Sequence, residues 1–132
     1  MEKLIMGTHH IALKAEGVEV YKKTVEFYKD LLGMPLVREW GEGAKSGIML
    51  DSGNCLMEIT ANGPDSPTSG SIRHIAFLTN EVDQLIERAR AAGYEIIMEP
   101  RDVTLPATPP YPIRVGFCIG PCKEEVEFFC EK

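Results

Sequence analysis

The sequence lacks the features that would direct the chain to a membrane or to nucleic acid. No run of about eighteen apolar residues is present to span a bilayer. The N-terminal stretch MEKLIMGTHH has no long apolar core of the kind found in a secretory signal peptide. The 20 acidic residues outnumber the 14 basic ones, the formal net charge is −6, and no basic patch stands out. We therefore expect a cytoplasmic protein that binds neither nucleic acid nor membranes.

The cysteines lack the paired spacing of a zinc finger. The chain has four cysteines and no CxxC pair. Most of them stand in strand-like runs, where a reduced thiol behaves as a small hydrophobic residue. Cys122 follows Pro121 in a turn, so it is the cysteine expected to be most exposed, and a reactive role for it is a minor alternative.

The sequence does contain an internal repeat. Its 132 residues, of which 44% are hydrophobic and 26% charged, suit one globular domain or two small half-domains that share a sheet. The stretch SIRHIAFLT at 71–79 restates THHIALKA at 8–15. In each half a histidine heads an apolar run, a helical segment ends in glycine, and a final strand-like run carries one glutamate. This order predicts one pseudo-symmetric site built from both halves.

The patterns of apolar residues predict two tandem β-α-β-β-β modules of the α+β class. Module one is expected at about 1–62 and module two at about 71–132, with a turn-rich linker at about 63–70. Strands are expected at 9–14, 35–40, 47–51, 55–60, 72–78, 95–99, 113–118 and 125–130, and helices at 18–32 and 82–92. The stretch TLPATPPYP at 104–112 is too rich in proline for either state. It is either a flap that carries Tyr111 over a pocket or a plain spacer.

Strand alternation separates the candidate ligands from the residues packed under the helices. His10 and His74 each share a face with a small alanine two residues on, which leaves room for a ligand. Glu58 and Glu127 lie among apolar neighbours, where a half-buried carboxylate is costly unless a partner such as a cation binds it. His9 is a second candidate, although it falls on the opposite face from His10. A lone histidine or glutamate in a strand is usually a structural or a solvated residue. A shared ligand site is favoured here because the histidine and the glutamate recur at corresponding places of the two repeats.

With these residues in place, the chain resembles the vicinal oxygen chelate superfamily, which includes glyoxalases, bleomycin-resistance proteins and extradiol dioxygenases. The matching pieces are HIAL at 10–13, FY at 27–28, LGM at 32–34, MEI at 57–59, HIAF at 74–77 and EFF at 127–129. The resemblance implies that the eight strands form one curved mixed sheet, a cup with its helices outside, and that the chain is a homodimer. The implied metal ligands are His10, Glu58, His74 and Glu127, and such a set suits Zn, Ni, Co, Mn or Fe.

A chain that keeps all four ligands looks like the glyoxalase I branch, because dioxygenases and fosfomycin-modifying members typically use two histidines and one glutamate. The resemblance implies a lactoylglutathione lyase-like lyase or isomerase. It would act on a small substrate with vicinal oxygens through an enediolate-like intermediate, with Glu127 or Glu58 as the base. An Fe(II) dioxygenase, a thiol transferase and a non-enzymatic drug- or metabolite-binding protein remain alternatives. Candidate residues for the substrate pocket are Lys14, Met49, Leu56, Tyr111 and Arg114.

Overall fold

The computed structural model describes residues 8–63, 74–107 and 109–132, and the chain divides into two compact units, Met1–Pro67 and Thr68–Lys132. The division falls in the predicted linker, most of which lies outside the described residues, as does the predicted strand start at 72. The organisation of the whole chain as a single domain stays a prediction. Among the described residues, no helix is both long enough and apolar enough to cross a membrane.

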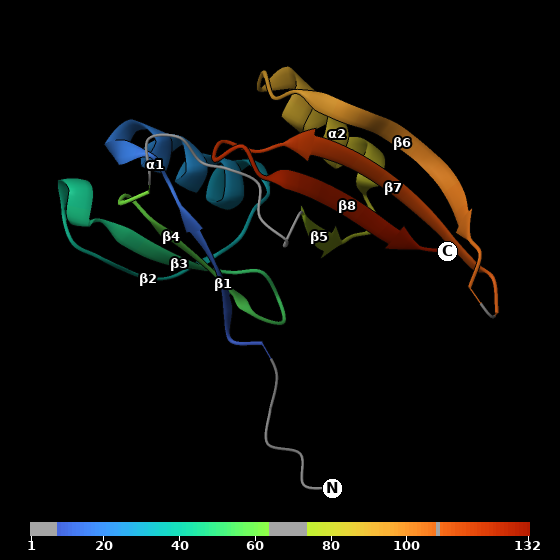
Figure 1. The fold of residues 1–132 in the computed structure, drawn as a ribbon, viewed down its shortest axis with the longest axis horizontal. Coiled ribbons are helices and arrows are strands. Elements are labelled where there is room, and N and C mark those ends of the chain that lie inside the picture. Colours follow the sequence, from blue (N-terminus) through green and yellow to red (C-terminus); the bar gives the residue numbers. More distant parts are fainter. Residues whose placement is uncertain (1–7, 64–73, 108) are drawn as a thin grey trace, which may run out of the picture. The chain divides into compact units, whose positions relative to one another are not determined.

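Unit 1 folds in the order β-α-β-β-β (Figure 1). Its elements are β1 (His10–Lys14), α1 (Gly17–Val25), a π-helical segment (Glu26–Leu31), β2 (Leu36–Trp40), a 3-10 turn (Gly43–Lys45), β3 (Gly47–Asp51) and β4 (Leu56–Thr60). The strands form a four-stranded mixed sheet in the order β1-β4-β3-β2, in which only the β1–β4 pair is parallel. The single helix predicted over 18–32 is therefore α-helical in its first part and π-helical in its second.

Unit 2 repeats the same topology. Its elements are β5 (His74–Leu78), α2 (Val82–Ala91), β6 (Ile96–Leu105), β7 (Tyr111–Ile119) and β8 (Glu125–Glu131). The sheet order is β5-β8-β7-β6, again with one parallel pair, β5–β8. The chain turns out of both helical segments through a left-handed glycine, Gly33 with φ of 80° and Gly93 with φ of 90°. The predicted α+β class and the tandem repeat are confirmed as two four-stranded mixed sheets.

Each sheet has one face packed under its helix and one face that we call the open face. In unit 1, Met57 and Ile59 are fully buried on the packed face of β4, against which α1 lies, and Glu58 between them points to the open face. In unit 2, Val126 and Phe128 are fully buried on the packed face of β8. Alternation therefore places Glu58 on the open face of unit 1, and Glu127 together with Glu125 and Glu131 on the open face of unit 2. The sequence pattern predicted this placement of Glu58 and Glu127.

The approach of α2 to its sheet depends on the absence of a side chain at Gly116. A Cβ atom added there would lie 2.8 Å from Cγ1 of Ile86 and 3.4 Å from Cγ1 of Val82. Both α2 residues are buried and lie on one side of the helix at the predicted helical spacing. Gly116 thus identifies the helix-covered face of unit 2.

The prediction for residues 104–112 is wrong at both ends. β6 continues to Leu105 and β7 begins at Tyr111, so the two strands form a long hairpin (Figure 1). Pro100 is accommodated because the register of β6 shifts between Met98 and Arg101, and a bulge on an edge strand tolerates a residue without an N–H group. Tyr111 is therefore a strand residue and not the tip of a flap.

Candidate functional site

The histidine and the glutamate of each unit occupy the same relative position in the two sheets. On the parallel strands of unit 1, His10 lies opposite Leu56, so Glu58 is the next residue on the same face. In unit 2, His74 lies opposite Glu125, so Glu127 is again the next residue on that face. Side chains at such diagonal positions are within reach of each other when they are long. The candidate imidazole and the candidate carboxylate therefore share the open face of each sheet.

Unit 2 brings its two candidates into direct contact. The Nε2 atom of His74 lies 3.3 Å from Oε1 of Glu127, and the side chain of Glu127 is only 11% exposed. Burial raises the pKa of the Glu127 carboxyl, and the neighbouring imidazole lowers it by less. The ring of Phe117 meets the His74 ring edge-on at 5.6 Å. This carboxyl group is thus largely withdrawn from water, with an imidazole nitrogen beside it.

In unit 1 the candidate glutamate is more exposed to solvent than its counterpart in unit 2. His10 is exposed at the start of β1, and Glu58 is half-buried between Ala12 on β1 and Met49 on β3. The Nδ1 atom of His10 lies 2.9 Å from Nδ1 of His9, so one of these rings donates to the other. His9 and His10, the two candidates for the same ligand position, are therefore hydrogen-bonded to each other. Of the two, His10 belongs to β1.

The described residues of neither unit alone assemble a complete set of metal ligands. Among the described residues, no group of three or more His, Cys, Asp or Glu side chains gathers to hold a metal ion. Each unit instead supplies one nitrogen and one oxygen donor, a pair that suits borderline divalent cations. Because Glu127 is buried beside a single imidazole, a cation there would offset the cost of its negative charge. The residues present fit the predicted cation, although no single unit completes its coordination.

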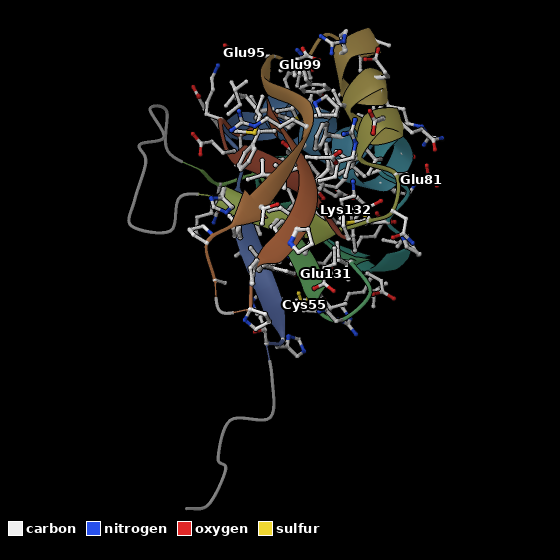
Figure 2. All side chains as sticks on the ribbon, turned by 90° about the vertical axis from the view of Figure 1, so that its right-hand side faces the viewer. Cys55, Glu81, Glu95, Glu99, Glu131 and Lys132 are labelled. Carbon is white, nitrogen blue, oxygen red and sulfur yellow. The ribbon has the colours of Figure 1, made fainter. Side chains whose placement is uncertain are left out.

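Four of the five predicted substrate-pocket residues lie on the open faces. Met49 neighbours Glu58, Leu56 neighbours His10, and Lys14 extends from the end of β1 opposite Thr60. In unit 2, the Tyr111 hydroxyl donates a hydrogen bond of 2.8 Å to Oε1 of Glu131, which Figure 2 labels near the end of β8. Their roles in substrate binding stay predictions.

Arg114 lies on the other face. It alternates with Gly116 on the helix-covered side of β7, where its guanidinium donates two hydrogen bonds of 2.7 Å to the Asp83 carboxylate and one of 3.2 Å to Asp102. Lys132 joins this cluster at 3.0 Å from Asp102. These bonds raise the pKa of Arg114 and connect α2 to the hairpin. Arg114 is therefore not beside His74 and Glu127, as a pocket-wall residue would have to be.

The open face of unit 2 also holds apolar residues that the sequence analysis did not assign to the site. Phe117 on β7 lies directly opposite Glu127, and Phe129 follows Glu127 by two residues on the same face. Leu78 lies opposite Phe129 at the end of β5 and is 76% exposed. The available signal was strand alternation, which places Leu78 with His74 and Phe129 with Glu127.

Cys118 does not supply a nucleophile to this face. Cys118 is fully buried on the helix-covered side of β7, and burial, with a smaller contribution from Glu124, raises the pKa of its thiol to about 12. Cys55 and Cys130 are free thiols outside the two His–Glu pairs. Among the described residues, the titratable side chains best placed for chemistry on the open faces are thus the histidines and glutamates.

Comparison with known proteins agrees with this arrangement. The family model described as "Glyoxalase/Bleomycin resistance protein/Dioxygenase superfamily" matches residues 7–108. A lactoylglutathione lyase of Arabidopsis thaliana is 34% identical over 89 residues, which are 61% of this chain and only 31% of that enzyme. The chain thus matches about a third of the length of this curated relative.

Solved structures show the same fold at low sequence identity. A glyoxalase/bleomycin resistance protein/dioxygenase from Alicyclobacillus acidocaldarius superposes with a TM-score of 0.65 at 19% identity, covering 96% of this chain and 92% of that one. The fosfomycin resistance protein FosX from Listeria monocytogenes, solved with Mn(II) and sulfate, gives a TM-score of 0.72 at 20% identity, with coverage of 98% and 95%. Together with the repeated topology and the matching family model, these similarities show that the chain belongs to the glyoxalase/bleomycin resistance protein/dioxygenase superfamily.

Proposed function

We propose that the chain is a metal-dependent lyase or isomerase of the glyoxalase I type. The observation that carries the proposal is the repeated diagonal placement of His10 with Glu58 and of His74 with Glu127 on the open faces of the two sheets. The similarity to a lactoylglutathione lyase supports the reaction class. A small-molecule substrate with two adjacent oxygens is the expected ligand.

The four side chains would together hold one divalent cation, with Zn, Ni, Co, Mn and Fe as the candidates. When bound, the cation supplies a Lewis acid that polarises the two vicinal oxygens of the substrate. The proposal requires the open face of a unit 1 to meet the open face of a unit 2, either within one chain or across a homodimer. Each face then contributes one imidazole and one carboxylate.

Glu127 is the stronger candidate for the catalytic base. Its carboxyl is more buried than that of Glu58, and its raised pKa brings proton uptake and release closer to neutral pH. Glu127 would take a proton from the carbon that carries the hydroxyl group and return a proton to the neighbouring carbonyl carbon, while the hydroxyl proton passes from the first of the two vicinal oxygens to the second. The substrate is isomerised without any net change in its atoms, and no external oxidant or reductant is needed.

The test is an assay of hemithioacetal isomerisation with each candidate metal added in turn. We expect metal-dependent turnover by the unmodified chain and a decrease of about 10²-fold or more in E127Q. E99Q is the matched control, because Glu99 is an exposed glutamate on β6 that pairs with Arg90, and it should leave turnover unchanged. Circular dichroism shows whether both variants stay folded.

The outcomes of that assay separate the alternatives. Oxygen consumption with a catechol, or thiol transfer to fosfomycin, in place of isomerisation would replace the proposed reaction with another one of the same superfamily. A metal-free protein that still binds small ligands would indicate a sequestering protein. Loss of turnover in E99Q equal to that in E127Q would remove the assignment of Glu127 as the base.

The same proposal includes a cytoplasmic location. Cys55, Cys118 and Cys130 carry free thiols, which a reducing compartment preserves. Fluorescence microscopy of a tagged full-length protein tests this location, and a signal confined to the exterior of the cell would contradict it.

A further inference from the structure

His9 and His10 meet through the ring nitrogens that lie closest to the backbone. The Nδ1 atoms of the two side chains are 2.9 Å apart. The rings are edge-on, with an interplanar angle of 85° and centroids 5.1 Å apart. Since Nδ1 is bonded to Cγ, adjacent residues can bring these two atoms together even though alternation directs their side chains to opposite faces. The contact therefore engages Nδ1 of each ring and leaves both Nε2 atoms outside it.

The backbone of His9 is held in place for this contact. Its carbonyl oxygen accepts a hydrogen bond of 2.9 Å from the N–H group of Leu56, the first residue of β4. Leu56 is also the residue that lies opposite His10 in the parallel β1–β4 pair. His9 is therefore anchored to the sheet of unit 1, although it precedes the first residue of β1.

A hydrogen bond between two imidazoles fixes the position of a proton. A neutral imidazole has one N–H donor and one unprotonated acceptor nitrogen, so one Nδ1 atom of this pair donates and the other accepts. If His10 donates, its Nε2 atom keeps a lone pair that can bind a cation. If His9 donates, the proton of His10 is on Nε2, which then cannot be a ligand. The direction of this hydrogen bond thus decides whether Nε2 of His10 can bind metal.

The sequence of unit 2 has no counterpart of His9. Arg73 stands immediately before His74, where His9 stands before His10. A guanidinium carries only donors, so it cannot accept a proton from a neighbouring ring. In His74 it is Nε2 that lies beside a carboxylate, 3.3 Å from Oε1 of Glu127. An imidazole acceptor directly before the candidate ligand histidine is therefore particular to unit 1.

We propose, resting on the proposed function, that His9 is a positioning residue for His10. The Nδ1–H group of His10 donates to Nδ1 of His9, and the proton of His9 is on its own Nε2. This bond holds the His10 ring in one orientation and leaves an unprotonated Nε2 for the cation. Histidine ligands of metals commonly donate their second ring N–H group to a carboxylate, a carbonyl oxygen or water. In unit 1 a second imidazole accepts that hydrogen bond.

The test measures the tautomer of His10 directly. The chain has three histidines, so their ring nitrogens can be assigned in a long-range proton–nitrogen correlation spectrum. The spectrum is recorded for the metal-free protein at mildly alkaline pH, where imidazoles are neutral. We expect a protonated Nδ1 and an unprotonated Nε2 for His10. In H9L, which has no acceptor at this position, the proton should move to Nε2, while the signals of His74 stay the same.

Asparagine at position 9 provides the matched control. Its Oδ1 atom is bonded to Cγ, as Nδ1 is in histidine, and it can accept the same proton. H9N should therefore keep the His10 tautomer of the unmodified protein. In calorimetric titration with Zn(II), the dissociation constant should rise by about 10-fold or more in H9L and stay almost the same in H9N. Circular dichroism shows whether both variants stay folded.

Three results would overturn the proposal at once: an Nε2-protonated His10 in the unmodified protein, an unchanged tautomer in H9L, or unchanged Zn(II) binding by H9L. If H9N weakens Zn(II) binding as much as H9L, the chain needs an imidazole at this position as a ligand, and a positioning role for His9 is wrong.

Failure of the proposed function gives a different result. An unmodified chain that binds no Zn(II), or that binds it and does not isomerise a hemithioacetal, removes the metal-dependent reaction. The spectra of the metal-free protein and of H9L then still decide whether His9 fixes the tautomer of His10. Conversely, metal-dependent turnover that H9L retains in full, with the His10 tautomer unchanged, keeps the reaction and excludes the role of His9.

Discussion

The two units fill the same core position with different pairs of residues. In unit 1, Ile48 on β3 lies opposite Ile59 on β4, and in unit 2 Gly116 on β7 lies opposite Phe128 on β8. Ile48, Ile59 and Phe128 are all at most 2% exposed. A small residue beside a large one thus replaces two of medium size. The repeat preserves register and burial, while the individual side chains differ.

The open faces differ in the opposite way. Here the histidine and the glutamate keep both their identity and their register, whereas the residues around them change. The pair Lys14 and Thr60 of unit 1 is replaced by Leu78 and Phe129 in unit 2, and Leu56 opposite His10 is replaced by Glu125 opposite His74. A core position needs only the right volume, but a metal ligand needs a particular donor atom at a particular place. This contrast is what the following substitutions test.

The largest expected effect is on the core of unit 2. Replacing Phe128 with alanine should lower the free energy of unfolding by about 3–5 kcal/mol, because it removes a fully buried ring. Ile59→Ala at the equivalent position of unit 1 should cost less, since it removes a smaller side chain. Urea denaturation of both variants measures the difference. An equal or larger loss in I59A would contradict the proposed division of volume between the residue pairs.

An intermediate effect is expected from filling the space at Gly116. The Cβ atom of G116A would meet the buried Ile86 side chain at 2.8 Å, and such overpacking costs about 1–3 kcal/mol. In G47A the new Cβ atom would meet the Trp40 ring, which is 41% exposed and can rotate away. The midpoint of urea denaturation should therefore fall further for G116A than for G47A.

A smaller, pH-dependent effect is expected from Glu127 in the metal-free protein. Burial raises its pKa in the folded state above the ordinary value of 4.5. The stabilising contribution of the protonated form is therefore complete below that value and is lost as the pH rises through the raised pKa. E127Q should be free of this loss, so its stability relative to the unmodified protein should increase from acidic to neutral pH. Parallel pH profiles of the two proteins in urea denaturation would contradict this assignment.

The smallest effect is expected from the charge cluster on the helix-covered face. The Arg114 hydrogen bonds lower the pKa of Asp83, and those of Lys132 and then Arg114 lower the pKa of Asp102. Their contribution is present above the ordinary pKa of aspartate and is lost as the pH falls through the lowered values. In R114M the free energy of unfolding should therefore decrease slightly less steeply as the pH is lowered into the acidic range. Because Arg114 lies on the far face, cation binding by R114M should match that of the unmodified protein.

Much of the fold was predictable because the repeat gives the same information twice. One strand histidine or one strand glutamate says little, but their recurrence at matching places predicted both the topology and the open-face placement of His10, Glu58, His74 and Glu127. Alternation along each strand was sufficient for this, because it depends only on local sequence.

The predictions were wrong where the structure of a residue depends on the strands and the helix next to it. Nothing in the local sequence shows that Arg114 faces α2, because that depends on which face of β7 the helix covers. The prolines of residues 104–112 suggested a break, whereas β6 continues to Leu105 and the start of β7 admits Pro112.

Calorimetric titration of a divalent cation into the unmodified chain, H10A and H74A tests the central claim most directly. If one cation is shared by the His–Glu pairs of both units, the unmodified chain binds about one equivalent. H10A and H74A should then each weaken that binding by at least about 10–100-fold. Two equivalents per chain, or normal binding by H10A when H74A abolishes it, would show that the two pairs do not share one cation.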